Sequence, residues 1–216
     1  MTTCERQAGF TLIEVVVVLG VLGLLLGSAM PLASAVIVNK RRTEAQQELD
    51  TLASALDSYY FEHASFPATL TATDFFGVHL QPGFASTATV DAFGQNVSYI
   101  YAVNAAQNFA TVHSIGENGR NDGFAREQLG VQVFGGVPGS RKTWMKLRIA
   151  IEVLANHIES GGSIVGTWPT VRTAMGLGSI YDQDGFGVVL SWNETAHTLT
   201  SAGPDRTFGT ADDITI

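Results

Sequence analysis

The chain has 216 residues, of which 45% are apolar and 15% charged, and 12 Lys and Arg against 20 Asp and Glu give a formal charge of −8. This balance excludes a disordered chain and a protein with many membrane spans, and an acidic chain without a basic stripe is a poor nucleic-acid binder. The single cysteine, Cys4, excludes an intramolecular disulfide. We therefore expect one large or two small domains, stabilised by packing or by a metal.

The first predicted element is an apolar helix over residues 10–30. At about 1.5 Å per residue, it has the length of the roughly 30 Å hydrocarbon core of a bilayer. It contains a carboxylate, Glu14, and a charge at the centre of a membrane costs about 2.5–3.5 kcal/mol or more, so it usually has a partner. A cut between Gly9 and Phe10 would create an α-amino group able to pair with Glu14 of a neighbouring subunit. Two alternatives are a secretory signal cut at Ala33-Ser34-Ala35 and a simple uncleaved anchor.

The segment Gly9-Phe10-Thr11-Leu12-Ile13-Glu14-Val15 resembles the prepilin cleavage and methylation motif of type IV pilins and type II secretion pseudopilins. The resemblance implies a leader over residues 1–9, cleavage after Gly9 and methylation of Phe10. It also implies that Glu14 neutralises the N-terminus of an adjacent subunit during assembly. Pro31 falls where many family members carry a helix-kinking proline. The expected processing residues are Gly9 and Phe10, and the expected assembly residues are Phe10, Glu14 and Pro31.

The helix is predicted to continue over residues 31–66 as a soluble half, because apolar residues recur with helical spacing at Ala45, Leu49, Leu52, Leu56, Tyr59 and Tyr60. It should end before Pro67, since the residue before a proline disfavours helix. A first pilin-like head is expected over residues 67–137, with a turn at Asp91-Ala92-Phe93-Gly94 and strand-like runs over 97–103, 109–115 and 130–134.

The same plan restarts after a glycine-rich linker at 135–140. A second helical stripe is predicted to end at Gly161-Gly162; its residues are Trp144, Leu147, Ile151, Leu154 and Ile158. Three motifs then repeat in order: Trp168-Pro169 echoes Phe66-Pro67, Asp184-Gly185-Phe186-Gly187 echoes residues 91–94, and residues 198–203 echo 111–116. This order predicts a tandem duplication with a second pilin-like head over 138–216; chance similarity of short motifs is the alternative. The expected fold class is α+β, with a long N-terminal transmembrane and assembly helix followed by two helix-plus-antiparallel-sheet units.

The C-terminal loop, residues 201–214, carries the strongest chemical signal after the N-terminus, because it holds Asp205, Asp212 and Asp213. Calcium takes about six to eight oxygen ligands, which a bent acidic loop can supply. The loop closely resembles the C-terminal calcium loop of the major pseudopilin of type II secretion. The resemblance implies calcium ligands from these three side chains and from the backbone oxygens of Ala202 and Thr210. The alternative is an acidic Asx-turn loop without metal.

No catalytic constellation is expected. The chain has no H-x-x-x-H pair, no G-x-S-x-G elbow and no phosphate-cradling loop, and its five histidines are scattered: His63, His79, His113, His157 and His197. The sequence therefore predicts a structural subunit and not an enzyme.

The resemblance implies a pseudopilin at the bacterial inner membrane, single-pass, with its head on the periplasmic side, that helps to export folded proteins. Its implied partners are copies of itself and minor pseudopilins or pilins in a helical filament, the prepilin peptidase, an inner-membrane assembly platform and membrane lipid. The alternative is a major or minor pilin of a type IV pilus involved in adhesion, motility or DNA uptake. Nucleic acid is expected as a partner only in the DNA-uptake case.

Overall fold

The computed structural model describes residues 11–81, 89–94, 97–124 and 129–216, without the side chains of residues 26 and 28–33. Its contacts divide the chain into two units, Met1–Thr43 and Glu44–Ile216. Apart from Thr11, the described part of the first unit belongs to helix α1, Leu12–His63, which continues into the second unit. The cleavage residues Gly9 and Phe10 lie outside the described residues.

Helix α1 confirms the long N-terminal helix expected from the sequence, although it ends at His63 and not at residue 66. The chain leaves the helix at Ala64, whose φ is 56° and whose amide still bonds the Tyr60 carbonyl at 2.8 Å. A single left-handed residue is a common way to end a helix. Within the second unit, the predicted stripe of α1 is buried; its members are Ala45, Leu49, Leu52, Leu56, Tyr59 and Tyr60.

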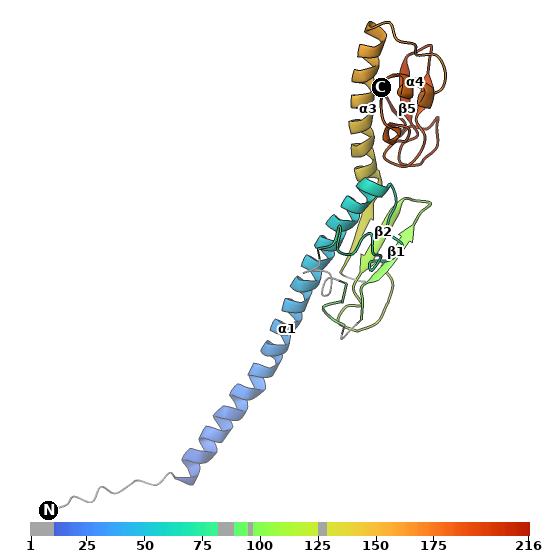
Figure 1. The fold of residues 1–216 in the computed structure, drawn as a ribbon. Coiled ribbons are helices and arrows are strands. Elements are labelled where there is room, and N and C mark those ends of the chain that lie inside the picture. The colour runs from blue at the N-terminus through green and yellow to red at the C-terminus, as the bar shows by residue number, and fades with distance from the viewer. Residues whose placement is uncertain (1–10, 82–88, 95–96, 125–128) are drawn as a thin grey trace, which may run out of the picture. The chain divides into compact units, whose positions relative to one another are not determined.

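The first sheet is antiparallel, in the order β1-β2-β3, with strands Ile100–Asn104, Phe109–His113 and Gly130–Phe134. It lies beside the C-terminal part of α1 (Figure 1). The strand expected over 97–103 begins later, because the carbonyl of Val97 accepts the amide of Asp91 at 2.8 Å and so closes a turn. Leu52 and Leu56 of α1 pack in one core cluster with Val112 of β2 and Val133 of β3.

The predicted linker at 135–140 is wrong, because helix α3 spans Gly136–Glu159. Pro138 stands in its first turn, where a proline lacks no helix hydrogen bond, and the amide of Gly139 already bonds the Gly135 carbonyl at 3.0 Å. The helix ends near the predicted Gly161-Gly162, where Gly161 has a φ of 78°.

The buried face of α3 differs in part from the predicted stripe. Leu147 and Leu154 are buried as expected, but Trp144 is 52% exposed and Ile158 39% exposed. Thr143 and Ala150 take their places in the interior. The Thr143 hydroxyl donates to the Gly139 carbonyl and accepts the amide of Gly185 at 2.8 Å, so this buried polar group is satisfied.

Two short helical elements, α4 and η1, precede a second sheet, β4-β5-β6, which is also antiparallel. In chain order they and the strands are α4 (Trp168–Ala174), η1 (Ser179–Tyr181), β4 (Ser191–Asn193), β5 (Thr198–Ser201) and β6 (Ile214–Thr215). Figure 1 shows α4 and β5 beside α3. A second core cluster joins Leu147 and Leu154 of α3 to Trp168 of α4 and Leu199 of β5.

Two buried aspartates organise equivalent turns, and each turn precedes one of the two sheets in the chain. The carboxylate of Asp91 accepts the amide of Phe93 at 2.9 Å and the Ser114 hydroxyl at 2.8 Å. That of Asp184 accepts the amide of Phe186 at 2.8 Å and the Ser201 hydroxyl at 2.7 Å. In turn, each serine oxygen accepts the amide two residues later, Gly116 at 2.9 Å and Gly203 at 3.2 Å.

One of the three repeated motifs adopts different structures in its two copies. Trp168-Pro169 starts helix α4, whereas residues 66–67 lie outside any helix or strand. The fold is therefore α+β with antiparallel sheets, as expected, and the duplication and the head boundaries at 67–137 and 138–216 stay predictions.

Candidate assembly and cation-binding sites

The N-terminal part of α1 presents apolar side chains that no core covers. Between Leu12 and Leu25 its large apolar residues range from 46% exposed at Val15 to 84% at Leu12. Glu14 lies in the first helical turn, where the positive end of the helix dipole favours an anion. The backbone of Pro31 lies within α1.

No helix within the described part of the chain has the length and hydropathy needed to cross a membrane. The membrane span expected over residues 10–30 is therefore not confirmed.

The C-terminal loop is folded around its own carboxylates. Asp205 accepts the amide of Thr207 at 2.8 Å, which is an Asx turn. Asp212 accepts the amide of Asp205 at 3.0 Å and the Thr210 hydroxyl at 2.6 Å, and Asp213 accepts the amide of Gly209 at 2.8 Å. Gly203 has a φ of 67°, and a side chain there would meet the carbonyl of Asp212.

These bonds keep negative charge in the loop. The Thr210 hydroxyl, followed by the amide of Asp205, lowers the pKa of the Asp212 carboxyl. The Asp205 amide and the Asp212 carboxylate join two turns of the loop. The donor set of carboxylates, hydroxyl and backbone carbonyls is of the hard type that calcium prefers. The residues therefore fit calcium in chemistry. The ligand atoms of Asp205, Asp212 and Asp213 do not, however, all lie within 4.8 Å of one another.

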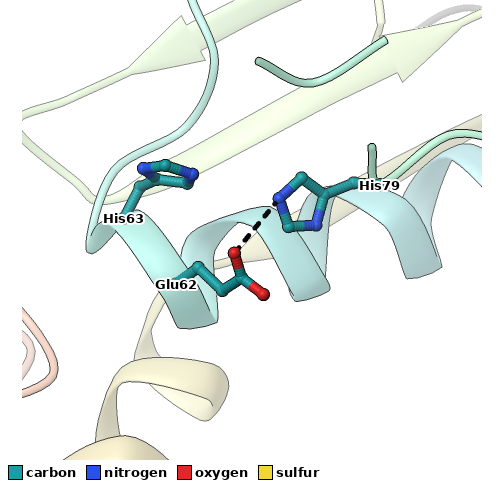
Figure 2. A group of neighbouring side chains, drawn as sticks. All are labelled: Glu62, His63 and His79. Atoms are coloured by element: carbon teal, nitrogen blue, oxygen red, sulfur yellow. Dashed lines mark ion pairs between the residues drawn. The ribbon is translucent and has the colours of Figure 1, made fainter. Parts of the chain in front are cut away.

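The group that does meet this distance among the described residues is one that the sequence did not predict: Glu62, His63 and His79. Figure 2 shows the Glu62 carboxylate turned toward the His79 ring, with the His63 ring nearby. Glu62 and His63 end α1, while His79 lies in a turn. The motif search missed them because no short spacing links residue 79 to residues 62 and 63.

Comparison with known proteins gives three findings. A family model described as "Prokaryotic N-terminal methylation motif" matches residues 5–30. The toxin coregulated pilin of Vibrio cholerae is 37% identical over 67 residues, which are 31% of this chain and 30% of that protein. The type II secretion system core protein G of Pseudomonas aeruginosa is 34% identical over 65 residues, 30% of this chain and 46% of that protein.

The chain thus spans less than half the length of these relatives. No solved structure matches it. The matched methylation motif thus stands at the head of the exposed apolar part of α1. The chain is therefore similar in part to type IV pilins and type II secretion pseudopilins. Its relatives are structural subunits, which agrees with the expectation of a protein that is not an enzyme.

Proposed function

We propose that this chain is a structural pseudopilin that polymerises through its N-terminal helix and helps to export folded proteins from the bacterial inner membrane. The observation that carries the proposal is the exposed apolar surface of α1 behind a methylation motif, with Glu14 in the first turn. In this proposal, residues 10–30 hold the subunit in the bilayer and then pack between neighbouring subunits in the filament. The relation to core protein G supports it.

The proposal includes cleavage between Gly9 and Phe10 by a prepilin peptidase and methylation of Phe10. N-terminal sequencing of the membrane form should begin at Phe10. A start at Val36, after Ala33-Ser34-Ala35, would instead identify an ordinary secretory signal and contradict the proposal.

The second candidate is a subunit of a type IV pilus, which the relation to toxin coregulated pilin favours. Deletion of the gene separates the two. A pseudopilin predicts failed export of folded proteins with surface pili unchanged, whereas a pilus subunit predicts altered surface filaments, adhesion or DNA uptake with export unchanged. Secreted proteins and surface filaments should therefore be scored in the same deletion strain.

We also infer that the C-terminal loop binds calcium through the side chains of Asp205, Asp212 and Asp213, with the backbone oxygens of Ala202 and Thr210 as further ligands. Bound calcium would fix this loop against β6. The clustered loop carboxylates and the lowered pKa of Asp212 support the assignment.

Calcium should raise the melting temperature of the full chain in detergent, because a ligand that binds only the folded state stabilises it by mass action. At a calcium concentration one hundred times Kd, we expect a rise of roughly 5–10 °C. Asp212→Asn should remove this rise, while the exposed Asp50→Asn should keep it. Differential scanning calorimetry with calcium, with magnesium and with a chelator makes the measurement, and no shift at millimolar calcium would rule the site out.

Finally, we infer that residues 67–137 and 138–216 are tandem pilin-like units that arose by duplication. The matching bonds around Asp91 and Asp184, and the same β-meander order after each, support this inference. Residues 138–216 then form an additional head on an otherwise ordinary subunit.

A further inference from the structure

We propose that Glu62, His63 and His79 form a binding site for a divalent transition metal of the zinc type. One ligand atom from each lies within 4.8 Å of the other two. Two imidazoles and one carboxylate are a ligand set that zinc accepts, usually with an open fourth position. Calcium prefers oxygen ligands only, so this site is chemically distinct from the C-terminal loop.

The second observation is the state of His79 itself. Its side chain is only 4% exposed, and its Nε2 atom is buried without a hydrogen-bond partner. That atom faces Glu62, whose carboxylate oxygen lies 3.6 Å away, a distance that allows an ion pair but is too long for a hydrogen bond (Figure 2). Buried polar atoms are normally satisfied, and each exception needs an explanation. A metal ion held between Nε2 and the carboxylate supplies the missing partner.

The surroundings of His79 hold the ring in the orientation that metal binding needs. Its Nδ1 atom lies 3.1 Å from the Ser58 hydroxyl. When Nδ1–H donates to this oxygen, Nε2 keeps its lone pair for the metal, which is the usual arrangement of a metal-bound histidine. The backbone is fixed too, because the amide of His79 bonds the carbonyl of the buried Phe75 at 3.0 Å.

The other two ligands, Glu62 and His63, can move toward His79. His63 stacks on the Tyr59 ring at a centroid distance of 4.2 Å, and the Tyr59 hydroxyl donates to Asp74 at 2.6 Å. Glu62 and His63 are exposed, so their side chains can rotate toward the buried nitrogen. Tetrahedral ligands at zinc distances lie roughly 3.3–3.5 Å apart, so only small rotations are required. The bound ion would fasten the turn that carries His79 to the last turn of α1.

Titration of the full chain in detergent with zinc chloride tests the site. The protein should carry no histidine tag and should first be stripped with a chelator. Isothermal titration calorimetry is expected to give one zinc ion per chain, and cobalt(II) should produce the absorption of a tetrahedral site. Millimolar calcium should not displace the zinc.

The exposed ligands give the decisive variants, since His63→Gln and Glu62→Gln leave the core intact. Each should weaken zinc binding by at least tenfold, and Ser58→Ala should weaken it about tenfold through the orientation of His79. His197→Asn is the matched control: it removes an exposed histidine whose φ of 53° suits asparagine, outside the proposed ligand set. Asp212→Asn, in the calcium loop, should also bind zinc as the wild type does.

Absence of zinc binding by the wild type would overturn the proposal. Unchanged binding by both His63→Gln and Glu62→Gln would also overturn it, because it would show an adventitious ion held elsewhere. Equal melting temperatures of the stripped proteins establish that the variants are folded.

Discussion

Replacement of Glu14 by leucine is expected to leave the amount and the membrane association of the protein unchanged and to remove it from assembled filaments. Glu14 lies in the first turn of α1 among exposed apolar side chains. In the proposed filament its carboxylate neutralises the α-amino group of an adjacent Phe10. Leucine suits the bilayer better than a carboxylate does, but it leaves that amino group buried and unpaired, which costs about 3–5 kcal/mol. Since each 1.4 kcal/mol is about a factor of ten, incorporation should fall well beyond tenfold.

Sheared filaments, collected by sedimentation and compared with the membrane fraction by immunoblot, measure this effect. Glu14→Asp keeps the charge and should retain part of the incorporation. Val16→Leu is the matched control, because it changes a nearby exposed apolar residue without altering charge. Normal incorporation of Glu14→Leu would mean that Glu14 is only an interfacial charge and that pairing with the N-terminus does not drive assembly.

The elements that local sequence determines were predicted well. The stripe from Ala45 to Tyr60 has the helical period, and α1 buries it as expected. Where tertiary contacts decide, the predictions failed. Residues 135–140 look like a linker because of their glycines, yet the chain continues there as α3. Trp144 matched the helical stripe, but the interior accepts Thr143, since its hydroxyl bonds the turn at Gly185.

The candidate sites divide in the same way. The motif around Glu14 and the acidic loop around Asp212 are contiguous in sequence, so residue patterns alone could indicate them. The group of Glu62, His63 and His79 depends on the path of the chain after α1. That path brings His79, sixteen residues after His63, back to the end of the helix. A scattered histidine has no local signal, and only the folded chain places it beside its neighbours. The role of the buried aspartates was likewise hidden: each D-x-F-G motif indicated a turn, and the fold adds a distant serine to it.

These aspartates give the second large expected effect: Asp91→Ala and Asp184→Ala should each lower the free energy of unfolding by about 3 kcal/mol. Asp91 is 1% exposed and Asp184 2% exposed. Each carboxylate accepts hydrogen bonds from two backbone amides and one serine hydroxyl, Phe93, Ile115 and Ser114 for Asp91 and Phe186, Val188 and Ser201 for Asp184. Alanine leaves these donors buried without an acceptor, at roughly 1–3 kcal/mol for each one that water cannot reach.

Hydrogen exchange of the full chain in detergent resolves the effect by segment. Under the proposed tandem arrangement, Asp91→Ala should lower protection mainly in β1–β3, and Asp184→Ala mainly in β4–β6, because each carboxylate joins one turn to the sheet of its own unit. The exposed Asp50→Ala is the control and should change stability by less than about 0.5 kcal/mol. Equal loss of protection in both sheets from either substitution would mean that residues 67–216 unfold as one cooperative body. The matching hydrogen bonds would then describe a shared turn type, and the proposal of two separate heads on one assembly helix would fail.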